Sequence, residues 1–152
     1  MNALSALLSD RDVLLGLEVS SKKRLFEEIA RHVERIHGLP YAQVLESLNS
    51  REQLGCTALG SGVAIPHARI EGLAHTVAAY LRPKTPIQFD APDRKPVSDV
   101  LALLVPEHAT EEHLQTLASL AQLFSDRHFR EQLRACTEAA SIRRLFADWP
   151  NG

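Results

Sequence analysis

The sequence has little that would place the chain in a membrane, on a nucleic acid or outside the cell. Its longest purely apolar run, from Val100 to Val105, has six residues, far short of the ~20 that a membrane-spanning helix needs. The formal net charge of −2 lacks the basic excess that nucleic-acid-binding domains usually show. The first residues, Met1 to Ser5, lack the basic start and long apolar stretch of a secretory signal. We therefore expect a cytoplasmic protein that neither inserts into a membrane nor binds nucleic acid.

Cysteine is equally scarce. Cys56 and Cys136 are the only two and lie 80 positions apart, so we interpret both as reduced thiols. The histidines form no close Cys/His cluster and no His-Glu-x-x-His pattern, which are the spacings typical of zinc sites. Nothing in the sequence requires a metal or an organic cofactor. The 152 residues, of which 45% are hydrophobic and 24% charged, suffice for one full core. We expect a single domain over residues 1–152.

Hydrophobic spacing predicts strands that alternate with helices. Strands are expected over residues 12–19, 63–65, 77–81 and 97–105. Helices are expected from a Ser20 or Ser21 cap to Gly38, over about 41–51, over the segment with Leu114 to Phe124, and near 129–133 and 138–146. The glycine-rich residues 55–62 and the proline-rich residues 83–96 should be loops. This order predicts an α/β fold in which helices pack on both faces of a mixed β-sheet.

The segment Gly60-Ser61-Gly62-Val63-Ala64-Ile65-Pro66-His67 could present a histidine that accepts a phosphoryl group. Such an imidazole must be neutral, with one nitrogen held by a hydrogen bond and the other carrying a free lone pair. Pro66 cannot donate a sheet hydrogen bond, so the strand should end there with His67 at its tip. Gly60 and Gly62 would let backbone N–H groups face phosphate oxygens. Arg51 is the nearest upstream arginine that could offset the added charge.

Spacing alone leaves simpler interpretations of these residues open. His67 could be an ordinary turn residue, since short motifs match by chance. Gly60 and Gly62 could only shape a tight turn, and Arg51 could be a solvated arginine at a helix end. The chemistry of the residues therefore permits a phosphoryl-accepting site without requiring one.

A longer pattern adds to this. Its matching elements are Glu52, Leu59-Gly60 and Val63-Ala64-Ile65-Pro66-His67-Ala68, and it continues through residues 85–91, 96–97 and 101–106 to His113-Leu114. In these elements the chain resembles the enzyme IIA family of the bacterial phosphotransferase system, of the mannitol/fructose type. The resemblance covers nearly the whole chain. The sequence of residues 54–60 and 85–91 is most similar to that of the nitrogen-regulatory branch of the family.

The resemblance implies roles for individual residues. His67 would be the catalytic phosphoryl acceptor, a candidate for phosphorylation at its tele nitrogen, with an HPr-like phosphocarrier protein as donor. His113 would support or orient the phosphoryl group and Arg51 would stabilise its charge. Thr57, together with Gly60 and Gly62, would bind the phosphate.

The nitrogen-regulatory branch further implies a phosphoryl carrier whose phosphorylation state regulates partner proteins, such as potassium transport components or sensor kinases. A sugar-specific fructose- or mannitol-type IIA component, which passes the phosphoryl group to a IIB domain, is the near alternative. Two alternatives of other classes are a metal-dependent hydrolase built on some of the seven histidines and a purely structural interaction module.

Overall fold

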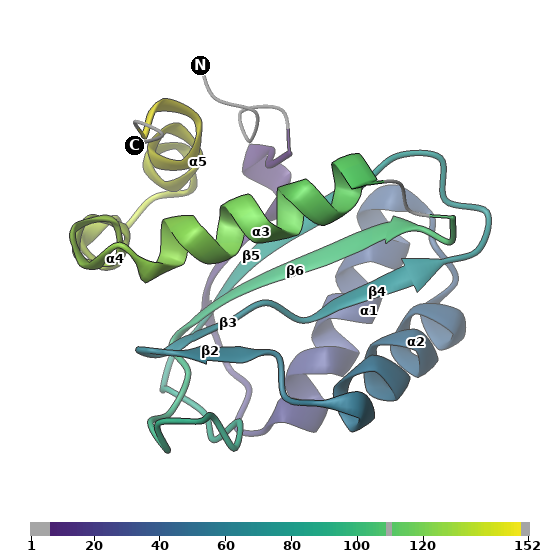
Figure 1. The fold of residues 1–152 in the computed structure, drawn as a ribbon, viewed down its shortest axis with the longest axis horizontal. Coiled ribbons are helices and arrows are strands. Elements are labelled where there is room, and N and C mark those ends of the chain that lie inside the picture. The colour runs from purple at the N-terminus through teal and green to yellow at the C-terminus, as the bar shows by residue number, and fades with distance from the viewer. Residues whose placement is uncertain (1–6, 109–110, 150–152) are drawn as a thin grey trace.

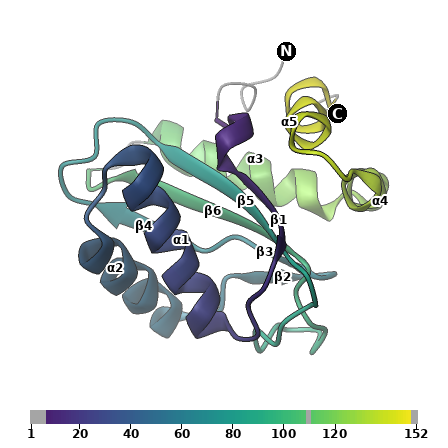
Figure 2. The same cartoon turned by 180° about the vertical axis from the view of Figure 1, so that it is seen from behind.

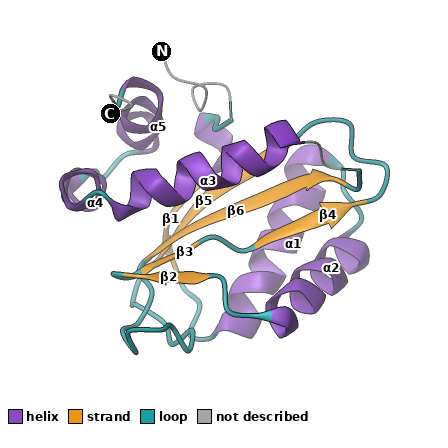
Figure 3. Ribbon diagram, viewed as in Figure 1, coloured by secondary structure: helices purple, strands orange, loops and turns teal. Residues whose placement is uncertain are grey.

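The computed structural model describes residues 7–108 and 111–149, with all of their side chains except those of residues 112 and 113. The strands are β1 (Val13–Leu17), β2 (Ala58–Gly60), β3 (Val63–Ala64), β4 (His67–Ile70), β5 (Val77–Pro83) and β6 (Asp99–Pro106). The helices are the 3-10 turn η1 (Asp10–Asp12), α1 (Lys22–His37), α2 (Tyr41–Leu54), α3 (Glu111–Ser125), α4 (Arg127–Ala135) and α5 (Ala139–Asp148). Figure 3 shows how the helices enclose the strands.

Strand β6 occupies the centre of one mixed sheet (Figure 1). It pairs antiparallel with β5 on one side, and β5 pairs parallel with β1. On its other side β6 pairs parallel with two short strands in succession, first with β3 and then with β4. Strand β2 extends the sheet as an antiparallel partner of β3. The near-continuous apolar sequence of β6 is explained by this position, because both of its faces are covered.

Helices cover both faces of the sheet, as Figures 1 and 2 show from opposite sides. Helices α1 and α2 pack on one face, with Phe26 and Leu48 in a core that also includes Val100, Ala102 and Leu104 of β6. The C-terminal helices α3, α4 and α5 pack on the other face, around the alternate residues Leu101 and Leu103 of β6. This alternation is the two-residue period of a strand. The predicted α/β fold with a mixed sheet between helices is confirmed.

The ends of α1 follow from its sequence. Ser21 is the N-cap, and its hydroxyl accepts a hydrogen bond from the backbone N–H of Arg24 at 3.1 Å. Gly38 ends the helix in the left-handed region, with φ of 71°, a conformation that glycine adopts without a steric penalty. Among the described residues, none of the helices has the length and apolar character needed to span a bilayer.

Two strands lie where the sequence predicted none. Residues 58–60, within the expected loop, form β2, because the turn Gly60-Ser61-Gly62 reverses the chain with three positive φ angles and lets it pair with β3. His67 is also not at the tip of a strand: it begins β4, where it pairs with Leu103. Pro66 separates β3 from β4 but does not end the pairing of this segment with β6, because the carbonyl of Pro66 accepts the N–H of Leu103 at 2.9 Å.

Candidate functional site

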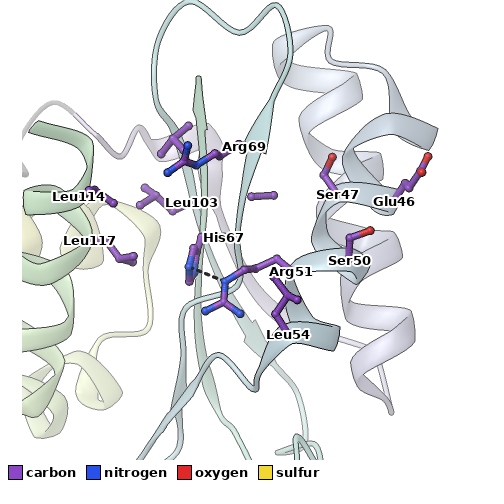
Figure 4. Close-up of a pocket in the computed structure, with 12 residues that line it drawn as sticks. Glu46, Ser47, Ser50, Arg51, Leu54, His67, Arg69, Leu103, Leu114 and Leu117 are labelled. Atoms are coloured by element: carbon purple, nitrogen blue, oxygen red, sulfur yellow. Dashed lines mark hydrogen bonds between the residues drawn. The ribbon is translucent and has the colours of Figure 1, made fainter. Parts of the chain in front are cut away.

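The imidazole of His67 has a hydrogen-bond partner at each of its nitrogens, and Figure 4 shows the partner at one of them, Arg51. Its Nδ1 lies 2.8 Å from the carbonyl oxygen of Ile65. Because a carbonyl only accepts hydrogen bonds, Nδ1 must carry the ring proton. The opposite nitrogen, Nε2, then has a free lone pair, and the Nε–H of Arg51 donates toward it at 3.3 Å. The contacts thus select one neutral tautomer, with Nε2 as the nucleophilic atom.

The surroundings of His67 also keep the ring neutral. Burial lowers the pKa of His67, and the positive charge of Arg51 lowers it further. The hydrogen bond to Ile65 and the negative charge of Glu52 act in the opposite direction, but the net pKa lies below the ordinary value. At neutral pH the Nε2 lone pair is therefore available.

Arg51 reaches His67 from the last turn of α2 across the edge of the sheet. In the described residues β4 pairs only with β6, so no strand separates the end of α2 from the His67 side chain. A second contact orients the guanidinium, because its Nη1 donates to the carbonyl oxygen of Gly55 at 3.0 Å. The Nε–H is thus directed at Nε2 of His67 while Nη1 is held by the backbone.

His67 opens into a cavity of about 500 Å³ between α2 and α3. The cavity is lined by Glu46, Ser47, Ser50, Arg51 and Leu54 of α2, His67, Ala68 and Arg69 of β4, Leu103 and Val105 of β6, and Leu114 and Leu117 of α3. Two exposed leucines, which we call the apolar rim, line it beside the exposed polar residues Glu46, Ser50 and Arg69: Leu54 is 85% exposed and Leu114 is 54% exposed. Large apolar side chains exposed around a reactive nitrogen are typical of a surface that a protein partner covers.

Arg69 is a second cation of this cavity, and it was not among the site residues expected from the sequence. It lies two positions after His67 in β4, and residues two apart in a strand project to the same face. Its Nη1 lies 3.5 Å from the carbonyl oxygen of Glu107. The signal was present in the sequence, but it becomes readable only once residues 67–70 are known to form a strand.

Residues 6–149 match the family described as "Phosphoenolpyruvate-dependent sugar phosphotransferase system, EIIA 2". The chain belongs to this family. It is similar to the crystal structure of nitrogen regulatory protein IIA-Ntr from Neisseria meningitidis, with 46% identity, a TM-score of 0.90, and coverage of 95% of this chain and 99% of that one.

Relatives of known type within the family also resemble this chain to different degrees. The nitrogen regulatory protein of Pseudomonas aeruginosa is 37% identical over 153 residues, which cover 100% of this chain and 99% of that protein. A fructose-specific EIIA component from Haloferax volcanii is 32% identical over 104 residues, 68% of each chain. The likeness to the nitrogen regulatory proteins is thus both higher and longer.

Three residues expected to bind phosphate are not brought to the cavity of this EIIA domain. Thr57 is only 5% exposed, and both its hydroxyl and its backbone N–H are directed at the carboxylate of Glu52. Gly60 and Gly62 lie in the turn between β2 and β3, where a Cβ would meet Asp93 and Arg134 respectively. None of the three lines the cavity of His67. The glycines shape a turn, as the simpler interpretation had it.

The side chain of His113 lies outside the described residues. Its backbone belongs to the first turn of α3, the helix that also supplies Leu114 and Leu117 to the cavity. The supporting role of His113 therefore stays a prediction. Of the site residues expected from the sequence, the structure brings together His67 and Arg51.

The hydrolase alternative required a group of metal ligands. Among the side chains that the structure describes, which leave out those of residues 112 and 113, there is no group of three or more His, Cys, Asp or Glu that could hold a metal ion. The hydrolase hypothesis thus gains no support from the described part of the chain.

Proposed function

We propose that the chain is a phosphoryl-carrier protein of the nitrogen-regulatory type, in which Nε2 of His67 accepts a phosphoryl group from a phosphohistidine of an HPr-like carrier. The observation that carries the proposal is the neutral ring, held by Ile65 so that its free Nε2 lone pair opens into the cavity beside Arg51. Membership of the EIIA family supports it.

The transfer balances without loss of a proton at His67. The Nε2 lone pair attacks phosphorus, the P–N bond of the donor breaks, and its electron pair returns to the donor imidazole. Nδ1 keeps its proton on the Ile65 carbonyl, so the phosphorylated ring is a cation that remains a good leaving group for the next transfer. Phosphoryl transfer depends mainly on such positioning and on charge stabilisation.

Two cations are placed to stabilise the added charge. Once Nε2 carries phosphorus, the Nε–H of Arg51 can donate to a phosphoryl oxygen instead, and charge-assisted bonds of this kind are among the stronger hydrogen bonds. Arg69 projects from the same strand face into the same cavity. The phosphoryl group carries close to two negative charges, which the positive ring offsets only in part, and this change alters which partner fits the exposed rim.

The apolar rim favours a protein donor over a small molecule. Leu54 from α2 and Leu114 from α3 flank the cavity, and a donor protein that covers them would exclude water from the transferring group. Potassium transport components and sensor kinases are the classes of regulated target that we propose for the phosphorylated or unphosphorylated surface. Such partners act in or face the cytoplasm, where we place this protein.

The test is reconstitution with phosphoenolpyruvate, enzyme I and an HPr-like carrier, followed by intact-mass spectrometry. We expect one acid-labile phosphoryl group, lost in His67→Ala and retained in His75→Ala, which alters an exposed histidine outside the cavity. A label that persists in His67→Ala would overturn the proposal.

The two branches of the family are separated by their carriers. A nitrogen-type carrier should phosphorylate His67 faster than a sugar-type carrier, and transfer from His67 to a fructose- or mannitol-type IIB domain should be slow. Fast transfer to such a IIB domain would favour the sugar-specific alternative.

A further inference from the structure

Glu52 follows Arg51 in α2 but does not line the His67 cavity. Its carboxylate accepts three hydrogen bonds: from the Thr57 hydroxyl at 2.7 Å, from the Thr57 backbone N–H at 3.1 Å and from Nζ of Lys22 at 3.0 Å. The Glu52 side chain is 9% exposed. The two bonds to Thr57 fix both the backbone and the side chain of that residue.

From Thr57 one chain of hydrogen bonds leads to Nδ1 of His67. The carbonyl of Thr57 accepts the N–H of Ile65 at 3.0 Å. The carbonyl of Ile65 in turn accepts Nδ1–H of His67 at 2.8 Å. Thr57, which Glu52 holds, is therefore hydrogen-bonded to Ile65, and the carbonyl of Ile65 sets the tautomer of His67.

A second chain leads from the same segment to Nε2. Gly55 lies two positions before Thr57, and its carbonyl accepts Nη1 of Arg51 at 3.0 Å. The Nε of the same guanidinium lies 3.3 Å from Nε2 of His67. Residues 55–57 thus hold, at their two ends, the groups that face both nitrogens of the ring.

We propose that Glu52 is a positioning residue for His67: by clamping Thr57 it fixes residues 55–57, and through them the Ile65 carbonyl and the Arg51 guanidinium. Its effect on transfer rests on the proposed function, but its effect on the imidazole does not, because the tautomer is a property of the unphosphorylated protein.

The charge of Glu52 is part of this role. Burial by itself would raise the pKa of Glu52, but the hydrogen bonds from Thr57 and Lys22 outweigh burial and lower it. All three groups that face the carboxylate are donors. A glutamine has nearly the same shape but no charge, so the Thr57 backbone N–H and Nζ of Lys22, which both face Oε2, would lose the charge assistance of their bonds. Its NH₂ group would have to use the Thr57 hydroxyl as an acceptor, which reverses the bond at Oε1.

The competing explanation is that Glu52 only joins α2 to α1 through its ion pair with Lys22. Lys22→Met removes that pair and leaves Thr57 and its two bonds to Glu52 in place, so it is the matched control. Thr57→Val removes the hydroxyl from the clamp while keeping the residue's size, and Thr57→Ser restores the hydroxyl.

The experiment measures these three variants and Glu52→Gln in two ways. Long-range ¹H–¹⁵N NMR of the imidazole reports the tautomer of His67 without any phosphoryl transfer. Single-turnover transfer from a phosphorylated HPr-like carrier reports the rate, and thermal unfolding checks that each variant is folded. Failure of the carrier to phosphorylate even the wild type would count against the proposed function alone, since the NMR measurement still tests Glu52.

We expect Glu52→Gln and Thr57→Val to mix the two tautomers and to slow transfer by about ten- to hundred-fold, the cost of a misplaced reacting group. Thr57→Ser should restore both readouts, and Lys22→Met should lower stability but leave both readouts as in wild type. The inference is overturned if Glu52→Gln keeps the wild-type tautomer, or if Lys22→Met reproduces the changes of Glu52→Gln.

Discussion

His67 donates its Nδ1–H to the carbonyl of Ile65, which stands two positions earlier on the other side of Pro66. The turn made by this short segment of backbone thus determines which nitrogen of its own histidine can react. This segment is itself held in the sheet, because the carbonyl of Pro66 accepts the N–H of Leu103 at 2.9 Å. In the transfer that we propose, the main chain would fix the nucleophile and side chains would stabilise the added charge.

The first prediction concerns the pH dependence of His67. Because burial and Arg51 lower its pKa, the ring should stay neutral below the ordinary value of about 6.5, and acceptance should fall only as pH drops through the lowered pKa. Arg51→Met should raise the pKa. NMR titration of the imidazole checks both, and a pKa that is unchanged in Arg51→Met would contradict them.

The same shift affects stability, with a definite sign. In the unfolded chain His67 has its ordinary pKa of about 6.5. As pH falls below that value, the unfolded state binds a proton at His67 while the folded state, with its lowered pKa, does not. The free energy of unfolding should therefore decrease between the ordinary and the lowered pKa. His67→Gln should remove this part of the pH dependence in denaturant unfolding, and an unaltered pH profile would show that His67 is not perturbed.

Phosphoryl transfer should require the guanidinium group of Arg51 and not only its positive charge. Arg51→Met should slow transfer by roughly a hundred-fold, as the loss of a charge-stabilising donor does elsewhere. Arg51→Lys should recover only part, because lysine cannot face both Gly55 and His67 in one fork. Transfer kinetics measure this, with Arg24→Met as control, since that exposed arginine pairs with Glu27 on α1. A lysine variant with the full wild-type rate would contradict the bidentate role.

The apolar rim should determine donor affinity. Leu54→Ser should weaken binding of the HPr-like carrier by about ten-fold, equivalent to ~1.4 kcal/mol, with little change in unfolding temperature because the side chain is already 85% exposed. Leu59→Ser is the matched control, since Leu59 is also exposed but lies on β2 outside the cavity. Equal losses in both variants would indicate that the carrier docks elsewhere.

Gly62 should matter for stability and not for phosphate. A Cβ there would lie 2.8 Å from Nη2 of Arg134 and 3.2 Å from the Ser98 hydroxyl, at a φ of +80°. Gly72→Ala is the matched control, because Gly72 has nearly the same φ, +82°, and nothing within 4 Å. Gly72→Ala should cost about 1–2 kcal/mol of backbone strain and Gly62→Ala more, both with wild-type transfer rates. Slow transfer in Gly62→Ala alone would restore the phosphate role.

Much of the fold was predictable because its signals are local. The period of α1 together with Ser21 and Gly38, and the apolar run of β6, appear in consecutive residues. Strands β2 and β4 were missed because they are short edge strands. Their pairing depends on contacts with β3 and β6. Pro66, directly before β4, also favoured the prediction that the strand ends there.

The site residues that belong to a recognisable sequence pattern were predictable. The hydrogen-bond partners that depend on contacts between distant segments were not. His67 and Arg51 were found in the sequence and meet in the structure. The family resemblance implied a phosphate contact for Thr57, but the hydrogen bond of its hydroxyl to Glu52 depends on how the end of α2 lies against residues 55–57 and could not be predicted from the sequence. The tautomer of His67 could not be read from the sequence at all, since it depends on where the Ile65 carbonyl points.

Locating phosphorus on the ring of His67 tests the account most directly. The protein is phosphorylated through the carrier with ¹⁵N-labelled histidine, and ¹⁵N and ³¹P NMR identify the bonded nitrogen. We predict phosphorus on Nε2 with a proton still on Nδ1. Phosphorus on Nδ1, or on any other residue, would contradict the account.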